Sequence, residues 1–257
     1  MKLFDTHAHL YDKAFDNDRD TMLAGVFDVC DYVVCPAEDF STSEAALSLA
    51  RQYPQIYAAV GIHPQLTKEA TEEEFSAIRK LAEENKKVVA IGEIGLDYYY
   101  LYSEIDVQKT WFARQIELAK ELDLPIIIHD RDAHGDMMDI LRAHKDSKLR
   151  GILHCYSGSL EMAEELIGMG FYISFAGPIV FPKSTKLKEI AQKLPLEKIL
   201  VETDSPYLTP PPFRGRRNDS SKVRYVAEEI AKLKGVSFEE VAEKTRWNAL
   251  EIYRIKA

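Results

Sequence analysis

The sequence has little cysteine and no long apolar run, and both absences limit the classes of protein to which it can belong. Its 257 residues include three cysteines, Cys30, Cys35 and Cys155, with no CxxC motif and no paired framework. This usage is typical of a reducing compartment rather than of a disulfide-stabilised secreted domain. No apolar run approaches the ~20 residues of a membrane span. The start of the chain also lacks the basic segment and apolar stretch of a signal peptide. We therefore expect a cytoplasmic protein that does not associate with membranes.

The chain also lacks an excess of positive charge. Its formal net charge is -9 at pH 7, which argues against a protein that coats nucleic acid or an anionic membrane through its overall field. A nuclease is not excluded, because a cleft can be locally basic, or charged by metal ions, on an acidic body. The hydrophobic fraction of 46% and the charged fraction of 29% are those of an ordinary globular protein. Because no linker or low-complexity segment interrupts the chain, we expect a single domain over residues 1–257.

Short strand-like runs alternate with amphipathic helical stretches along the whole sequence. Runs such as Ile126-Ile127-Ile128 are apolar on both faces, as expected of parallel strands covered by helices. Strands are predicted at residues 2–6, 32–35, 56–61, 88–92, 125–128, 151–153, 171–174 and 199–202. Helices are predicted at residues 43–52, 71–85, 107–122, 133–144, 160–169, 186–193, 222–234 and 238–255.

The spacing of the strand ends predicts the fold class. Positions 7, 35, 63, 93, 129, 154, 174 and 204 follow one another at the length of one βα unit. Eight such units predict an α/β protein of the (β/α)8 TIM-barrel type, with an extra C-terminal helix. A doubly wound open sheet is the alternative, but no glycine-rich phosphate fingerprint follows the first strand.

Candidate metal ligands accompany the predicted strands. His7 and His9 are two residues apart on an extended segment, so their side chains point the same way. A lone His-x-His pair belongs more often to an ordinary loop. Four further potential ligands, however, follow short apolar, β-branched runs: Glu93, His129, His154 and Asp204. The C-terminal ends of barrel strands meet at one mouth, so we expect all six side chains to converge there.

The number and type of these ligands predict two divalent ions. Four imidazoles and two carboxylates exceed the need of one ion, since a tetrahedral site is full with four ligands. Glu93 is the natural bridge, because a carboxylate offers one oxygen to each ion. Nitrogen-rich ligation favours Zn or Mn over Mg, which prefers oxygen ligands.

Six stretches of the sequence form a series of specific motifs in a fixed order. They are residues 4–10 (FDTHAHL), 61–64 (GIHP), 91–98 (IGEIGLDY), 125–129 (PIIIH), 154–158 (HCYSG) and 202–208 (ETDSPYL). In these motifs the sequence resembles the TatD family of metal-dependent deoxyribonucleases, within the amidohydrolase-like barrels, and the resemblance covers the chain from residue 3 to about 218. The family usually has a proline shortly after an Arg-Asn pair, where this chain continues from Arg217 as Asn-Asp-Ser-Ser.

The resemblance implies a ligand set and a reaction. One ion would be held by His7, His9, Glu93 and Asp204, and the other by Glu93, His129 and His154. The implied reaction is hydrolysis of phosphodiester bonds in DNA, often in the 3′ to 5′ direction.

Catalytic roles follow from these residue types. A metal-bound water can have a pKa of ~7, which provides hydroxide without a strong external base. Asp204 is expected to take the proton of that water as a general base. For His63, a contact to the phosphate or leaving group and a core position are both open. Glu202 is either a partner that orients a metal-binding histidine or a buried structural acid. Cys155 is expected to point away from the barrel lumen.

Two segments are candidates for substrate contact. The tyrosines at residues 98–100, with Tyr102, follow Glu93 closely enough to line the mouth and stack on bases; aromatic packing within the loop is the alternative. Residues 213–217, with Arg214, Arg216 and Arg217, form the concentrated basic stretch and could contact a phosphate backbone. A solvated loop is the alternative for the basic stretch. We take Tyr98, Arg214 and Arg217 as the candidate substrate residues.

Three functions agree with this pattern. The first is a two-metal nuclease acting on single-stranded or frayed DNA ends. The second is an esterase or amidohydrolase with the same machinery, such as a D-aminoacyl-tRNA deacylase, because hydroxide attacks a carbonyl as readily as phosphorus. The third is a non-enzymatic metal-binding scaffold, which would not need open water positions. The aromatic run and the basic stretch favour nucleic acid as the substrate, and we expect a monomer.

Overall fold

Eight parallel strands follow one another in sequence order within residues 1–256, which are the residues that this computed structural model describes. Each strand pairs with the next one along the chain, which confirms the predicted (β/α)8 barrel and excludes the doubly wound order. The strands are β1 (Leu3–Asp5), β2 (Cys30–Pro36), β3 (Ile56–Val60), β4 (Val88–Asp97), β5 (Ile126–Arg131), β6 (Gly151–Leu153), β7 (Phe171–Phe175) and β8 (Ile199–Val201).

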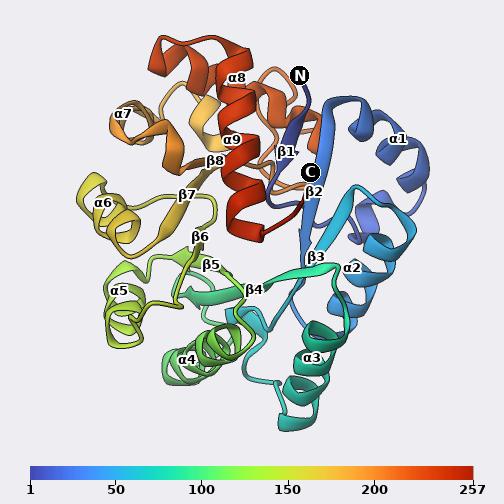
Figure 1. Ribbon diagram of the computed structural model, residues 1–257, viewed down its shortest axis with the longest axis vertical. Helices are drawn as coiled ribbons and strands as arrows, with labels where there is room; N and C mark the ends of the chain where they lie inside the picture. The colour runs from blue at the N-terminus through green and yellow to red at the C-terminus, as the bar shows by residue number, and fades with distance from the viewer. Residues whose placement is uncertain (257) are drawn as a thin grey trace.

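Helices surround the barrel, as the view along its axis shows (Figure 1). The surrounding helices are α1 (Arg19–Val29), α2 (Phe40–Gln52), α3 (Glu72–Glu84), α4 (Ile105–Glu121), α5 (His134–Ala143), α6 (Leu160–Gly168), α7 (Thr185–Lys193) and α8 (Val223–Lys234). All of these except α1 match predicted helices. Helix α1 was missed because its apolar pattern is weak: it buries only Leu23 and Val26.

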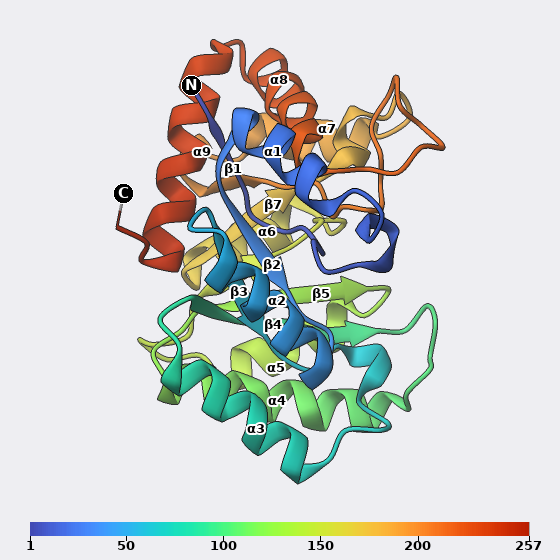
Figure 2. The same cartoon turned by 90° about the vertical axis from the view of Figure 1, so that its right-hand side faces the viewer.

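Helix α9 (Phe238–Tyr253) is the predicted extra helix, and it lies across one end of the barrel. Figure 2 shows α9 at this end and long loops at the opposite end. The buried side chains of α9, among them Leu250 and Tyr253, pack against Phe4, Val34 and other residues inside the barrel. The end that α9 covers is therefore filled by apolar side chains, and the loop end is left for chemistry.

The first and last strands are joined by polar contacts rather than by a regular ladder. Thr6 N donates to Val201 O at 3.2 Å, and Asp204 N donates to His7 O at 2.9 Å. The buried Asp5 carboxylate accepts hydrogen bonds from Thr203 N at 3.0 Å and from Thr203 Oγ1 at 2.6 Å. These contacts hold His7 and Asp204 beside each other, although they lie far apart in the sequence.

Strands β4 and β5 are longer than predicted, so Glu93 and His129 lie within strands rather than after them. Gly95 pairs with His129 and Asp97 pairs with Arg131. Gly95 makes this extension possible because it has a φ of +139°, and a Cβ atom there would lie 2.0 Å from the His129 carbonyl oxygen. Both Glu93 and His129 consequently have a rigid backbone on each side.

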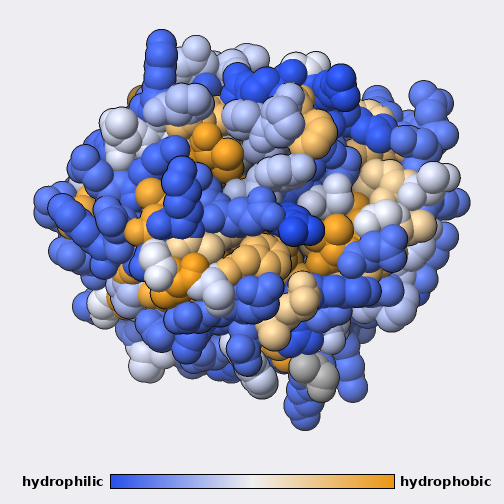
Figure 3. Space-filling view, turned by 90° about the horizontal axis from the view of Figure 1, so that it is seen from above, coloured by the Kyte–Doolittle hydropathy of each residue, from blue (hydrophilic) through white to orange (hydrophobic). Residues whose placement is uncertain are grey.

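Helices and loops present a largely polar exterior. Hydrophilic side chains cover most of the face seen in Figure 3, with hydrophobic ones between them. Across residues 1–256, the structure contains no helix with the length and apolar character needed to cross a membrane.

Replacing Phe4 by alanine should lower the free energy of unfolding by about 3–5 kcal/mol. The Phe4 ring is buried and stacks on Tyr253, with the ring centroids 5.9 Å apart, so its loss leaves a cavity between the barrel and α9. Urea unfolding followed by circular dichroism measures the change. Trp247→Ala, which removes a side chain of α9 that is 57% exposed, is the control and should change stability by less than about 0.5 kcal/mol. A similar loss in both variants would contradict the interpretation.

Candidate active site

A cavity of about 510 Å³ opens at the loop end of the barrel and contains most of the predicted ligands. His9, Glu93, His129, His154 and Asp204 line it. His7, which is fully buried, contacts four of them: its Nε2 atom lies 3.2 Å from both Glu93 Oε2 and His9 Nε2 and 3.7 Å from Asp204 Oδ1, and its ring stacks on His154. The structure thus brings together all six side chains that the sequence singled out.

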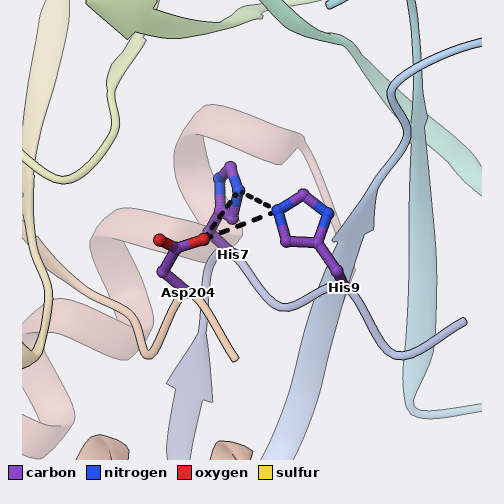
Figure 4. Close-up of side chains that lie close together, drawn as sticks. All are labelled: His7, His9 and Asp204. Carbon is purple, nitrogen blue, oxygen red and sulfur yellow. Dashed lines mark hydrogen bonds and ion pairs between the residues drawn. The ribbon is translucent and has the colours of Figure 1, made fainter. Parts of the chain in front are cut away.

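The first group of ligand atoms has the spacing of a tetrahedral metal site. His7 Nε2 and His9 Nε2 are 3.2 Å apart, and Asp204 Oδ1 lies 3.7 Å from the first and 3.5 Å from the second (Figure 4). Glu93 Oε2 lies 3.2 Å from His7 Nε2 and 3.7 Å from His9 Nε2. Ligands about 2.1 Å from a tetrahedral ion are separated by about 3.4 Å. His7, His9 and Asp204 therefore have the spacing to hold one ion, and Glu93 lies beside the two histidines.

A second group shares Glu93 through its other oxygen. Glu93 Oε1 lies 2.8 Å from His129 Nδ1 and 3.0 Å from His154 Nε2. The two carboxylate oxygens of Glu93 thus face different sets of imidazoles. This arrangement could place one ion on each side of Glu93.

Two of the histidines each contact a different fully buried carboxylate through the ring nitrogen that faces away from Glu93. His154 Nδ1 lies 3.0 Å from Glu202 Oε1, and His129 Nε2 lies 3.1 Å from Asp97 Oδ2. A carboxylate accepts a hydrogen bond from the N–H of the ring nitrogen that faces it, so in the neutral imidazole the other nitrogen has its lone pair free for a metal. Of the two interpretations of Glu202 that the sequence left open, this contact agrees with a partner that orients a histidine.

His7 and His9, which follow β1, differ from each other in the contacts of their Nδ1 atoms. His9 Nδ1 lies 3.1 Å from the Tyr11 hydroxyl, which in turn donates to Glu38 Oε2 at 3.4 Å, so His9 is also held through an acidic partner. His7 Nδ1 is buried and has no hydrogen-bond partner among the described residues. The orientation of His7 is instead fixed by its packing against His154.

His63 lines the same cavity, but its Nδ1 atom is a hydrogen-bond acceptor rather than a donor to a carboxylate. Its Nδ1 accepts a hydrogen bond from Gln65 N at 3.3 Å, so the neutral ring carries its proton on Nε2. That nitrogen faces the cavity, 3.7 Å from Glu93 Oε1. This tautomer makes His63 a hydrogen-bond donor, although its ring also lies close enough to the ligand atoms of Glu93 and His129 to share an ion with them.

The electrostatics of the site favour ionised carboxylates. Burial raises the pKa of the Glu93 carboxyl, but the imidazoles of His154 and His7 outweigh burial and hold the pKa well below its usual value. Burial also raises the pKa of Asp204, and the hydrogen bond to His9 with the nearby imidazoles lowers it by more. Burial and the neighbouring His129 lower the pKa of His63 to about 3, so this ring is neutral. The site thus offers anionic oxygens to a cation.

Two predicted residues lie elsewhere than expected, and a third already has an acidic partner. Tyr98 does not line the cavity, because its hydroxyl donates to Asp136 at 2.7 Å. Cys155 was expected to point away from the lumen but lines the cavity. Strand β6 ends at Leu153 and Cys155 has a φ of +43°, so strand alternation does not extend to it. The Arg217 guanidinium contacts both oxygens of Asp18 at 2.7 Å.

Within residues 1–256, the lining of the cavity includes no residue of the basic stretch. Arg214 stacks on Phe181, with its Cζ atom 4.1 Å from the ring centroid. A contact of Arg214 or Arg217 with substrate therefore stays a prediction.

The sequence pattern assigned no role to several residues in or beside the cavity. Asp97 contacts His129 from behind the cavity lining, and strand alternation, which places positions 93, 95 and 97 on one face, could have identified it. Arg131 lines the cavity from the end of β5, and Tyr207 lines it from the segment after Asp204. For these two, the sequence carried no signal beyond their nearness to predicted ligands.

Comparisons with known proteins agree with this geometry. A model of the family described as TatD related DNase matches residues 4–254. The Bacillus subtilis (strain 168) protein named uncharacterized metal-dependent hydrolase YabD is 45% identical over 254 residues, covering 98% of this chain and 99% of that protein. The 3'-5' ssDNA/RNA exonuclease TatD of Salmonella typhimurium is 33% identical, with 98% of this chain and 99% of that protein covered. The crystal structure of YJJV, a TatD homologue from Escherichia coli K12, matches with a TM-score of 0.93 and 29% identity over 99% of this chain and 98% of that chain. This chain therefore belongs to the TatD family and is a metal-dependent hydrolase.

Proposed function

We propose that this protein is a two-metal nuclease that removes nucleotides from the 3′ ends of single-stranded or frayed DNA. The observation that carries the proposal is the position of Glu93 between two sets of imidazoles. Paired metal sites that share ligands in this way are typical of enzymes that cleave phosphodiesters. The exonuclease name of the Salmonella relative supports the same substrate class.

The residues present fit two divalent ions. His7, His9, Glu93 and Asp204 would hold one, and Glu93, His129 and His154 would hold the other. Imidazole-rich ligation favours Zn or Mn, as the sequence already indicated. When bound, the ions supply Lewis acidity that offsets charge on the phosphodiester and makes water easier to ionise near neutral pH.

The side chains around the cavity have separate roles in this proposal. The Asp204 side chain, 15% exposed, reaches the cavity and accepts the proton of the attacking water on a carboxylate oxygen. The same carboxyl then returns the proton to the leaving oxygen. His63 donates a hydrogen bond from its Nε2–H group to a phosphate oxygen, which agrees with the contact that the sequence suggested.

The proposal is tested with labelled DNA. Full-length protein is stripped with a chelator, dialysed, and reloaded with Mn or Zn. Single-stranded DNA labelled at its 5′ end should then shorten from the 3′ end in single-nucleotide steps, and the stripped protein should leave it intact. A D-aminoacyl-tRNA is assayed beside it. Metal-dependent deacylation without DNA cleavage would replace the proposal by the esterase hypothesis, and no turnover of either substrate would favour the scaffold hypothesis.

A further inference from the structure

Aromatic side chains gather at the rim of the cavity, on the loop between β4 and α4. Tyr99, Tyr100 and Tyr102 are 58%, 43% and 62% exposed. The rings of Tyr99 and Tyr100 meet edge to face at 4.9 Å, and those of Tyr100 and Tyr102 stack at 5.4 Å. We call these three residues the tyrosine rim. The rings pack on one another and still remain exposed, and a contiguous exposed aromatic cluster beside a cavity is typical of a binding surface.

A cation without an acidic partner lies on the tyrosine rim. The Arg131 guanidinium carbon is 4.1 Å from the ring centroid of Tyr99 and 4.8 Å from that of Tyr100. Arg131 is exposed, and within residues 1–256 no carboxylate forms an ion pair with it. On a chain of net charge -9, this places a positive charge where a phosphate backbone would enter the cavity.

The tyrosine rim is continuous with the candidate metal centre. Tyr100 and Arg131 line the same cavity as Glu93 and His129. They extend from β4 and β5, the strands that also carry these two ligands. A polymer held on the rim would therefore have a neighbouring part within the cavity.

The loop that carries the rim is held firmly at both ends. Asp97 Oδ1 accepts hydrogen bonds from the backbone N–H groups of Tyr99 and Tyr100, both at 3.0 Å. Asp97 Oδ2, the oxygen that contacts His129, accepts a hydrogen bond from Gln65 Nε2 at 2.6 Å. At the far end, Ser103 Oγ accepts from Lys68 N at 2.9 Å and donates to Gln65 O at 3.0 Å. The exposed rings are thus presented by an ordered backbone, which lowers the entropic cost of binding.

We propose that the tyrosine rim and Arg131 form a platform on which unpaired bases of a single-stranded nucleic acid stack while the scissile phosphate lies at Glu93. The inference rests on the proposed function. Every base has a π-face, so stacking on tyrosine does not depend on sequence, and arginine adds cation–π attraction and a partner for phosphate. A base inside a duplex has both faces covered by its neighbours. The platform therefore selects unpaired bases.

The test compares two labelled single strands of equal length, an oligothymidylate and an abasic strand. Both have the same phosphates, but only the first has bases. The full chain, loaded with Mn and carrying Asp204→Asn so that the strands stay intact, is titrated with each by fluorescence anisotropy. We expect it to prefer the oligothymidylate. Combined Tyr99→Ala, Tyr100→Ala and Tyr102→Ala should weaken binding of the oligothymidylate by roughly 5- to 150-fold, the equivalent of one stacked base, and remove most of the preference.

Two control variants separate stacking from folding. Replacing the three tyrosines by phenylalanine keeps the rings and should keep the preference. Trp247→Ala removes an aromatic side chain of similar exposure from α9, at the opposite end of the barrel, and should leave both affinities unchanged. Circular dichroism and metal content verify that the alanine variant is folded.

Each outcome is decisive for one of the two proposals. An alanine variant that keeps the preference of its parent overturns the platform, even if the parent enzyme cleaves DNA. The platform is also overturned if the phenylalanine variant loses the preference together with the alanine variant. A clear preference in the parent, lost only in the alanine variant, supports the platform; if the wild-type enzyme nevertheless fails to cleave DNA, the nuclease function alone is wrong.

Discussion

Asp204→Asn should lower kcat on single-stranded DNA by about 10²–10⁴-fold, the usual worth of general-base assistance. The amide keeps an oxygen that can face His7 and His9 as Asp204 Oδ1 does, at 3.7 and 3.5 Å. It cannot accept the proton of the attacking water. We therefore expect the fold and most of the metal affinity to survive while turnover is lost. Single-turnover assays under saturating Mn measure the effect.

The matched control for this substitution is Asp139→Asn. Asp139 lies on α5, its side chain is 74% exposed, and it pairs with Arg142 at the surface. This variant should have the kcat of the parent. If Asp204→Asn lowers kcat by less than tenfold while binding the same amount of metal, Asp204 is a ligand and not a base.

Glu93→Gln should reduce the bound metal from two ions per chain to one or fewer, and should lower hydrolysis by more than about 10²-fold. Glu93 is nearly fully buried, and its two oxygens face separate sets of imidazoles. Glutamine offers a single oxygen and no charge, and its NH₂ group would face a histidine nitrogen that is needed as a ligand. Elemental analysis after loading with excess Mn, followed by kinetics, tests both parts of the prediction.

Glu202→Gln provides the comparison. Glu202 contacts His154 but not the ions in the proposed arrangement. Its replacement should weaken metal binding by about 10–100-fold, as is usual for a residue that supports a ligand. Two ions should still bind when metal is saturating. A parent protein that binds one ion with all six side chains intact would show that the two-ion prediction is wrong.

The sequence was sufficient to predict the barrel because most strands are short apolar runs followed by a helix of clear amphipathic pattern. It failed at α1, where two buried side chains give almost no periodic signal. The side chains expected at the mouth could be predicted because parallel strands bring their ends to one edge, so positions such as His7 and Asp204 meet regardless of their separation.

Other details of the site depended on tertiary contacts that no local pattern encodes. The length of β4 is determined by its pairing with β5 through Gly95, so Glu93 could not be placed within a strand from its own neighbours. The backbone of Cys155 leaves the strand conformation just after β6, which reverses the expected direction of its side chain. The orientation of Tyr98 follows from a hydrogen bond to Asp136 on α5, which is distant in the sequence.

The apolar end of the barrel also has a consequence for how the protein is made. The Tyr253 hydroxyl donates to the Thr6 carbonyl at 3.1 Å, and these residues are separated by 247 positions along the chain. Contacts between such distant segments form slowly, because a long loop must close before they are gained. A nascent chain in which α9 is still within the ribosome exposes Phe4 and Val34 to water or to other chains. Synthesis of α9 is thus the step that ends the exposure of this apolar surface to aggregation.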